Sequence, residues 1–390
     1  MSSSNDRNHF DDYREQTAVK HEILAAYLPA YFHILKSGNN NLLLIDGFAG
    51  RGTYTDAAGR AIDGSPLRAL KLIAETPAFH SKVSTIFVES DDILFPQLKE
   101  AVDNFYSQHQ SIRSPLCLHA TFAECVNEVL TRVNGNLAPT FLFVDPCGVS
   151  GTSLHAIKAV MDCDKCEAFI FFNIDGVRRT AGLEKLSHVL TDLMGSEERA
   201  KKLYDGLRKT ADSSQREALI LSEYRAALKE IVGANYIIPF RVEHEDKQKT
   251  SHYLIHVTKH PLGFRIMKDV MWKRGRDENR AGGLLFAQSS RTNYIPLFDN
   301  RGDTKREILD ALRTGPLRVS VFYERWSERP DDTLCESAYR EALLELESAG
   351  NIEVLNKDCK NVISALARKK WRGKPTLAED YYVRLPKADA

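Results

Sequence analysis

The sequence lacks any apolar run long enough to span a bilayer, and residues 1–17 are polar and charged, unlike a secretory signal. We therefore expect a cytoplasmic protein with no membrane partner. An excess of one charge is also missing, because 53 basic residues balance 53 acidic residues in a chain of 390. No global field favours nucleic acid, so any such binding has to come from a local patch.

Motifs for several common chemistries are absent as well. The seven cysteines are scattered, which favours reduced thiols over a disulfide framework. Cys163 and Cys166 have the spacing of a metal or redox pair, but no second pair or Cys/His cluster lies at a matching distance. We interpret them as structural thiols and expect no metal site. No Gly-Lys-Ser/Thr stretch supplies a phosphate-binding loop.

Apolar runs typical of buried strands alternate with helical patterns from residue 41 to about residue 175. Repeated strand and helix patterns of this kind predict a doubly wound parallel α/β sheet. A charged helical insertion at about 180–232 follows. Two later strands, separated only by the polar EHEDKQK, predict an antiparallel hairpin because the connection is too short for a crossover helix. Five parallel strands with a terminal antiparallel hairpin form the Rossmann-like fold of class I methyltransferases.

The length of the chain favours more than one domain. We expect an N-terminal arm at 1–17, a methyltransferase-like α/β domain at 18–300 and a separate domain at 301–390. The last segment has three helical patterns followed by a two-stranded ribbon, which is typical of a winged helix-turn-helix.

The stretch NLLLIDGFAGRGTY runs from a buried strand directly into an acid and three glycines. Glycines after such a strand allow a tight turn and close approach of backbone amides to a ligand. A carboxylate repels phosphate at close range and attracts an ammonium, which favours S-adenosylmethionine as the cofactor. Because TYTDAAGRAIDG separates the turn from the next helix, we expect the ligand amides to come from the loop. The predicted cofactor-binding residues here are Asp46, Gly47, Phe48, Ala49, Gly50 and Gly52.

Glu89 ends the second apolar strand, where an acid can accept hydrogen bonds from both ribose hydroxyls of a nucleoside cofactor. The alternative is that Glu89 and Asp91 only cap the following helix. After the third strand no acid stands where the adenine amino group would be held, and Thr121 or Glu124 are the possible substitutes.

The fourth strand ends in Asp145 and Pro146, the predicted catalytic residues. The pair is similar to the Asp-Pro-Pro loop of amino-methylating enzymes, in which a side chain and a carbonyl accept hydrogen bonds from the target amine. Here the second proline is replaced by Cys147, and no aromatic residue follows. Cys147 as a covalent nucleophile is the alternative, and a packed small residue is the simpler interpretation.

Two groups of basic residues are candidate nucleic-acid contacts. Arg178 and Arg179 follow the fifth strand and either hold an anionic substrate or are solvated turn residues. The ribbon near the C-terminus has a basic segment with an interleaved tryptophan, which could contact phosphates or instead dock a protein. Its predicted nucleic-acid-binding residues are Arg368, Lys369, Lys370, Trp371 and Arg372.

The ordered stretches KHEILAAYLPAYFHIL, IDGFAGRGTY, DGSPLRAL, IFVES, FLFVDPCG, FFNIDGVRR and TKHPLGFRIMKDVMWK resemble the three-Cys-motif partner protein family over most of residues 18–275. Members of this family look like bacterial class I methyltransferases and often have a winged-helix tail. The resemblance implies a separately encoded partner that is similar to radical SAM enzymes and carries the three-cysteine motif. It gives no role to the cysteines of this chain and no substrate.

Two functional hypotheses follow from these patterns. The first is an S-adenosylmethionine-dependent methyltransferase that acts on nucleic acid with a partner protein, in a phage-defence or mobile-element setting. The second is a non-catalytic partner or regulatory protein with a degenerate methyltransferase fold, which docks DNA or protein through its winged helix. Asp46, Gly50, Gly52 and Glu89 favour the first hypothesis, and the missing third acid and incomplete Asp-Pro loop favour the second.

Overall fold

A computed structural model describes residues 15–55, 59–181, 187–244, 247–275, 287–288, 300–329, 334–371 and 374–386. The expected N-terminal arm therefore lies almost entirely outside the described residues. The chain divides into two compact units, Met1–Phe264 and Arg265–Ala390, which we call unit 1 and unit 2.

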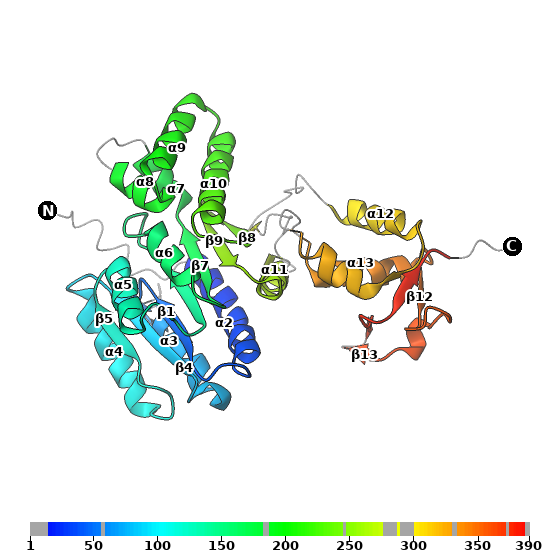
Figure 1. Cartoon of the computed structure of the whole chain (residues 1–390), viewed down its shortest axis with the longest axis horizontal. Helices are drawn as coiled ribbons and strands as arrows, with labels where there is room; N and C mark the ends of the chain where they lie inside the picture. Colours follow the sequence, from blue (N-terminus) through cyan, green and yellow to red (C-terminus); the bar gives the residue numbers. More distant parts are fainter. Residues whose placement is uncertain are drawn as a thin grey trace. The chain divides into compact units, whose positions relative to one another are not determined.

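The central strands of the unit 1 sheet are apolar and buried, and helices lie on both sides of the sheet (Figure 1). Its strands run in the order β8-β9-β7-β6-β1-β4-β5. Their bounds are β1 Leu42–Asp46, β4 Val83–Glu89, β5 Leu116–His119, β6 Thr140–Val144, β7 Glu167–Phe172, β8 Tyr236–His244 and β9 Lys247–Thr258.

Strand directions identify the fold. The pairs β1–β4, β1–β6, β4–β5 and β6–β7 are parallel, whereas β9 is antiparallel to both β7 and β8. The last strand is therefore inserted between β7 and β8, and the chain reverses direction there. This mixed α/β sheet has the Rossmann-like topology of class I methyltransferases, so the predicted parallel sheet with an antiparallel hairpin is confirmed.

Helices cover the two faces of this sheet. Six of the described helices on one face share a core with the strands. They are α5 (Phe122–Arg132), α6 (Leu154–Met161), α7 (Ile174–Thr180), α8 (Ser187–Met194), α9 (Glu197–Lys209) and α10 (Ser213–Glu230). On the other face, Tyr27 and Tyr31 of α2 (Glu15–Leu35) pack on the ring of Phe141. Helices α3 (Ser65–Ala74) and α4 (Leu94–Gln108) continue the same row.

A small β-hairpin fills the insertion after Gly52. Strands β2 (Thr53–Thr55) and β3 (Ala61–Asp63) pair antiparallel, and the Gly64 amide donates to the Gly52 carbonyl at 2.8 Å. The insertion thus brings Gly64 back to Gly52, and α3 begins at the next residue, Ser65. The short 3₁₀ helix η2 (Pro77–Phe79) then leads to β4.

Unit 2 has its own apolar core. It contains α12 (Asn300–Leu312), η4 (Val321–Trp326) and α13 (Glu336–Ser348), with a sheet in the order β11 (Leu317–Arg318), β15 (Tyr382–Arg384) and β12 (Glu353–Leu355). The remaining elements are β10 (Ala287–Gln288), η5 (Ala365–Ala367) and the ribbon β13 (Lys370–Trp371) with β14 (Lys374–Pro375).

The division between the units falls within α11 (Pro261–Gly275), whereas the sequence predicts a boundary at residue 300. The physical reason is that residues late in α11 bind within unit 2. The buried Lys268 ammonium donates to the Ser327 carbonyl at 2.8 Å, and the Asp269 carboxylate accepts the Ser337 hydroxyl at 2.9 Å.

Candidate functional site

Asp46 ends β1 as a buried acid, with only 2% of its surface exposed. Its Oδ1 atom accepts the Phe48 amide at 3.2 Å, but its Oδ2 atom has no hydrogen-bond partner among the described residues. Burial raises the pKa of Asp46 to about 7, although hydrogen bonds from the Ser65 side chain and the Phe48 amide oppose the rise. A buried carboxylate oxygen without a donor is costly in a protein and points to a cationic or donor group from a ligand.

The glycine turn is fixed to the end of the neighbouring strand. Gly50 and Gly52 have φ angles of 62° and 81°, a left-handed conformation that favours glycine. The Gly50 amide donates to Glu89 Oε2 at 3.0 Å, and the Ala49 amide donates to the Val88 carbonyl at 2.8 Å. The structure therefore brings Asp46, the glycines and Glu89 together, as the sequence analysis predicts.

The helix-capping alternative for Glu89 is also present. Glu89 Oε1 accepts the Asp91 amide at 2.8 Å, and Asp91 accepts the amides of Ile93 and Leu94 at the start of α4. Because each carboxylate oxygen has two lone pairs, this bonding still leaves acceptor capacity toward a ligand. Thr121 and Glu124, the substitutes for the missing third acid, bond each other in the capping box of α5.

Asp145 follows β6 at the same edge of the sheet as Asp46, since β1 and β6 are adjacent and parallel. Its carboxylate forms an ion pair with the ammonium of Lys20 from α2. The Lys20 Nζ also lies 5.0 Å from the ring centroid of Phe171 and 5.8 Å from that of Phe143. After Pro146, whose carbonyl accepts the Gly148 amide at 2.9 Å, the Cys147 side chain is exposed.

Sequence reasoning did not select Lys20 or Tyr54 as site residues. Lys20 lies three and four positions before the buried Ile23 and Leu24, so a lysine on the apolar stripe of the helix is the signal that could have identified it. An ideal Cβ at Gly50 would lie 2.6 Å from the Tyr54 hydroxyl oxygen, which places that hydroxyl against the turn. Burial and the nearby Asp145 and Asp46 raise the pKa of Tyr54.

The two arginines after β7 differ in their surroundings. Arg178 donates to Asp175 Oδ1 at 3.0 Å and to Glu217 Oε2 at 2.8 Å, and its side chain is 13% exposed. Arg179 is exposed at the surface. Arg178 thus links α7 to α10, and a phosphate contact by either arginine stays a prediction.

The basic residues near the ribbon of unit 2 also differ in burial. Arg368 is 4% exposed and forms an ion pair with Glu347 of α13, whereas Lys369 and Lys370 are exposed. The backbone of Trp371 pairs with Lys374, its side chain is outside the described part, and Arg372 lies outside the described residues. Among the described side chains of residues 368–372, those of Lys369 and Lys370 are therefore the ones exposed for contact with a phosphate.

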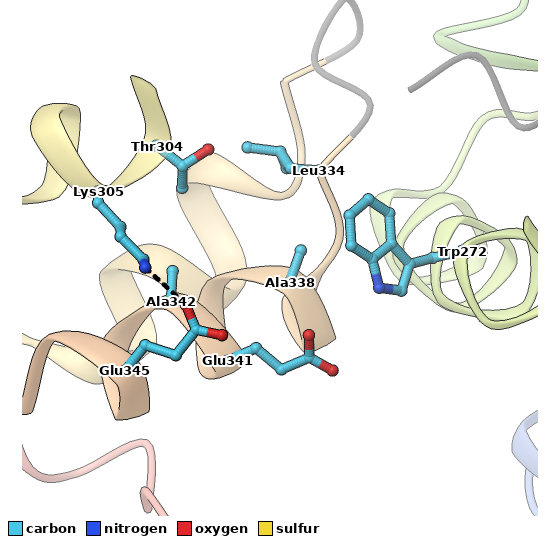
Figure 2. A pocket seen from close by; sticks show the side chains of 8 residues that line it. All are labelled: Trp272, Thr304, Lys305, Leu334, Ala338, Glu341, Ala342 and Glu345. Atoms are coloured by element: carbon cyan, nitrogen blue, oxygen red, sulfur yellow. Dashed lines mark ion pairs between the residues drawn. The ribbon is translucent and has the colours of Figure 1, made fainter. Parts of the chain in front are cut away.

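Unit 2 also contains a small pocket between α11, α12 and α13 (Figure 2). The Trp272 indole forms one wall, and the ion pair between Lys305 and Glu345, 2.7 Å long, forms another. No residue of the unit 1 crevice lines this pocket. Within the described ranges, no group of His, Cys, Asp and Glu side chains could hold a metal ion, and no helix is long and apolar enough to cross a membrane.

Comparison with known proteins leaves the family open. No family model matches the chain, and no curated protein matches it either. Among solved structures, protein LPL1258 from Legionella pneumophila is 11% identical with a TM-score of 0.42, and the match covers 66% of this chain and 90% of that one. At this level of similarity, the fold assignment rests on the strand order and directions given above.

Two further matches are a methyltransferase domain and a protein solved with S-adenosyl-L-methionine. The methyltransferase domain of a bacterial Hen1 is 9% identical with a TM-score of 0.31, covering 60% of this chain and 98% of that one. Trm1 from Pyrococcus horikoshii, solved with S-adenosyl-L-methionine, is 10% identical with a TM-score of 0.32, covering 73% and 66%.

Proposed function

We propose that this chain binds S-adenosylmethionine in the crevice at the carboxyl ends of β1, β4 and β6 and transfers its methyl group. The single observation that carries the proposal is the buried Asp46 carboxylate, whose Oδ2 atom has no donor. An ammonium on a cofactor would supply that donor, and the residues present therefore fit S-adenosylmethionine.

Each part of the crevice has a separate role in this proposal. Asp46 would bind the ammonium of the amino-acid tail, Glu89 would accept the ribose hydroxyls, and the glycine turn would leave room for the nucleoside. When bound, the cofactor supplies an electrophilic methyl group. The chain would contribute mainly the positioning of the acceptor against that group, and Asp145 and the Pro146 carbonyl are the groups proposed to contact the acceptor.

Isothermal titration calorimetry with S-adenosylmethionine tests this proposal. We expect the wild type to bind and Asp46→Asn to lose at least tenfold in affinity, because a charge-assisted hydrogen bond is removed. Asp92→Asn is the matched control, since the Asp92 side chain is 94% exposed and is not among the residues proposed to bind the cofactor. Absence of binding by the wild type, or equal affinity of the Asp46 variant, would overturn the proposal.

The acceptor we propose is nucleic acid, bound with the help of unit 2. The order α12, η4, α13 and a small antiparallel sheet is compatible with a winged helix, and the exposed Lys369 and Lys370 lie in its ribbon segment. Membership of the three-Cys-motif partner protein family, and therefore a separately encoded partner, is proposed on the sequence resemblance alone.

The non-catalytic alternative has one observation in its favour. The Asp145 carboxylate, which would face an acceptor, is already paired with Lys20 inside the chain. Incubation with methyl-labelled S-adenosylmethionine and a mixture of RNA and DNA separates the two functions. Label in nucleic acid that disappears with Asp145→Ala supports the enzyme, whereas tight cofactor binding without transfer supports the regulatory protein.

A further inference from the structure

The crevice contains several acids and one buried ammonium. Asp46, Glu89 and Asp145 end or follow three adjacent strands of the sheet, and Lys20 reaches them from α2 with only 6% of its surface exposed. We propose, on the basis of the proposed function, that Lys20 is a positioning residue. Its ammonium neutralises the charge of Asp145, so that Asp46 is the charged acid that receives a cationic ligand.

The geometry around Lys20 fixes its ammonium in place. The ion pair with Asp145 holds one side, and the rings of Phe143 and Phe171 lie within 5.8 Å and 5.0 Å on others. A cation over an aromatic face is attracted by the ring quadrupole, most strongly where water is excluded. Ile23 and Leu24 are buried in the next turn, so α2 cannot withdraw Lys20 without exposing apolar surface.

The charges explain why a cation is needed here. Asp145 is near enough to Asp46 that its negative charge raises the pKa of Asp46, in addition to the larger effect of burial. Lys20 lowers the pKa of Asp46, opposing both burial and Asp145. Because Lys20 binds Asp145 directly, the Oδ2 atom of Asp46 stays open for an outside ammonium.

Other titratable groups near Asp46 do not supply this cation. Tyr54 from β2 is near Asp46 and Asp145, but its raised pKa keeps the hydroxyl neutral. Arg51 lowers the pKa of Tyr54, and Glu89 raises it. His21, next to Lys20, has its pKa lowered well below the usual value by burial, with Lys20 and Arg68 adding to the effect. His21 therefore stays neutral through the range in which Asp46 titrates.

The first test is calorimetry with S-adenosylhomocysteine from pH 5.5 to 8.5 on the wild type, Lys20→Met and Lys20→Arg. Affinity should rise with pH as Asp46 loses its proton. In Lys20→Met the midpoint should move upward by about one pH unit, and Lys20→Arg should restore it. A Lys20→Met protein that binds with the wild-type midpoint would overturn the inference.

The second test needs no ligand, so it separates this inference from the proposed function. Melting temperatures at pH 8 are measured for the wild type, Asp46→Asn, Lys20→Met and the double variant, with Lys20→Gln in place of Lys20→Met if the latter does not fold. Asp46→Asn should raise the melting temperature more in the background that lacks Lys20. If Asp46→Asn raises the melting temperature equally with and without Lys20, the role of Lys20 is refuted even if the cofactor binds. If the rise is larger without Lys20 but no cofactor binds, only the proposed function is refuted.

Discussion

Asp46 has to be buried to hold a ligand tightly, yet burial works against its charge. Its pKa of about 7 lies above its ordinary value of 3.8, so the folded chain holds this proton more firmly than the unfolded chain does. The stability that this proton provides is complete below about pH 4 and is lost as the pH rises through about 7. Such a cost at neutral pH is expected at a binding site rather than in a core built only for stability.

The first prediction concerns this cost. Asp46→Asn should stabilise the ligand-free protein, and the gain in free energy of unfolding should be about 2 to 3 kcal/mol larger at pH 8 than at pH 5. Urea unfolding followed by far-UV circular dichroism measures it. Asp92→Asn provides the control and should change stability by less than about 0.5 kcal/mol at both pH values. A gain that does not depend on pH would contradict the titration of Asp46 in this range.

A second prediction uses two glycines of the same loop region. Gly50 and Gly59 both have positive φ angles of 62° and 78°, but only at Gly50 would a Cβ meet another group, the Tyr54 hydroxyl. Gly50→Ala should lose at least tenfold in S-adenosylmethionine affinity and about 1 kcal/mol or more in stability beyond Gly59→Ala. Calorimetry and urea unfolding of both variants test this, and similar affinity losses in the two would contradict a specific role for the Gly50 turn.

At the scale of elements, α2 is attached to the sheet at both ends of the strands. At the edge opposite the crevice, the buried Glu167 carboxylate accepts the Tyr27 hydroxyl at 2.5 Å, His256 Nε2 at 3.0 Å and the Thr258 hydroxyl at 3.0 Å. Even Gly263 is held close, since a Cβ there would lie 2.1 Å from Glu167 Oε1. This cluster orients the helix that carries Lys20.

The third prediction compares two tyrosines of this helix. Tyr27 donates to a carboxylate, whereas Tyr31 donates to the backbone carbonyl of Lys165 at 2.8 Å. Tyr27→Phe should cost about 1.5 to 3 kcal/mol and Tyr31→Phe about 0.5 to 1.5 kcal/mol, because hydrogen bonds to charged groups contribute more. Thermal and urea unfolding measure the difference, and equal costs would show that Glu167 is not the charged centre of the cluster.

The elements differ in how far the sequence predicts them. Long apolar runs such as β1 and β6 are predicted because burial on both faces leaves a local signal. The β2–β3 hairpin is not, because strands of three residues are too short to leave a hydrophobic pattern in the sequence. The Lys20–Asp145 pair spans 125 positions, so only the folded sheet brings its members together.

At the scale of the whole molecule, the two units can be followed separately. All three tryptophans, Trp272, Trp326 and Trp371, belong to unit 2, so tryptophan fluorescence reports on that unit alone. For Arg368, charge in the sequence predicts a ligand contact, but the sequence does not reveal that the side chain is buried and paired with Glu347.

The fourth prediction tests whether Lys369 and Lys370 of unit 2 contact DNA in the full chain. Lys369→Ala with Lys370→Ala should weaken binding to a 30-base-pair DNA duplex about tenfold and reduce the slope of log K against log salt by about 1.8. The matched control is the removal of two exposed lysines of α9, Lys201 and Lys209, which should leave binding unchanged. Fluorescence anisotropy at several salt concentrations measures both, and an unchanged slope would instead favour docking of a protein.

Arg368→Ala gives a different expectation. Loss of a buried partner of Glu347 should lower the melting temperature seen by tryptophan fluorescence, with a cost of about 3 kcal/mol. The transition of unit 1, followed by hydrogen exchange in β1, should be unaffected. A variant with normal stability and weakened DNA binding would show that Arg368 contacts the ligand after all.

The central claim is that the Asp46 crevice binds S-adenosylmethionine, and a crystal structure of the complex with S-adenosylhomocysteine tests it most directly. The structure should have the ligand ammonium within about 3 Å of Asp46 Oδ2 and the ribose hydroxyls at Glu89. A complex at saturating ligand with the amino-acid tail away from Asp46, or with no ligand in the crevice, would contradict it.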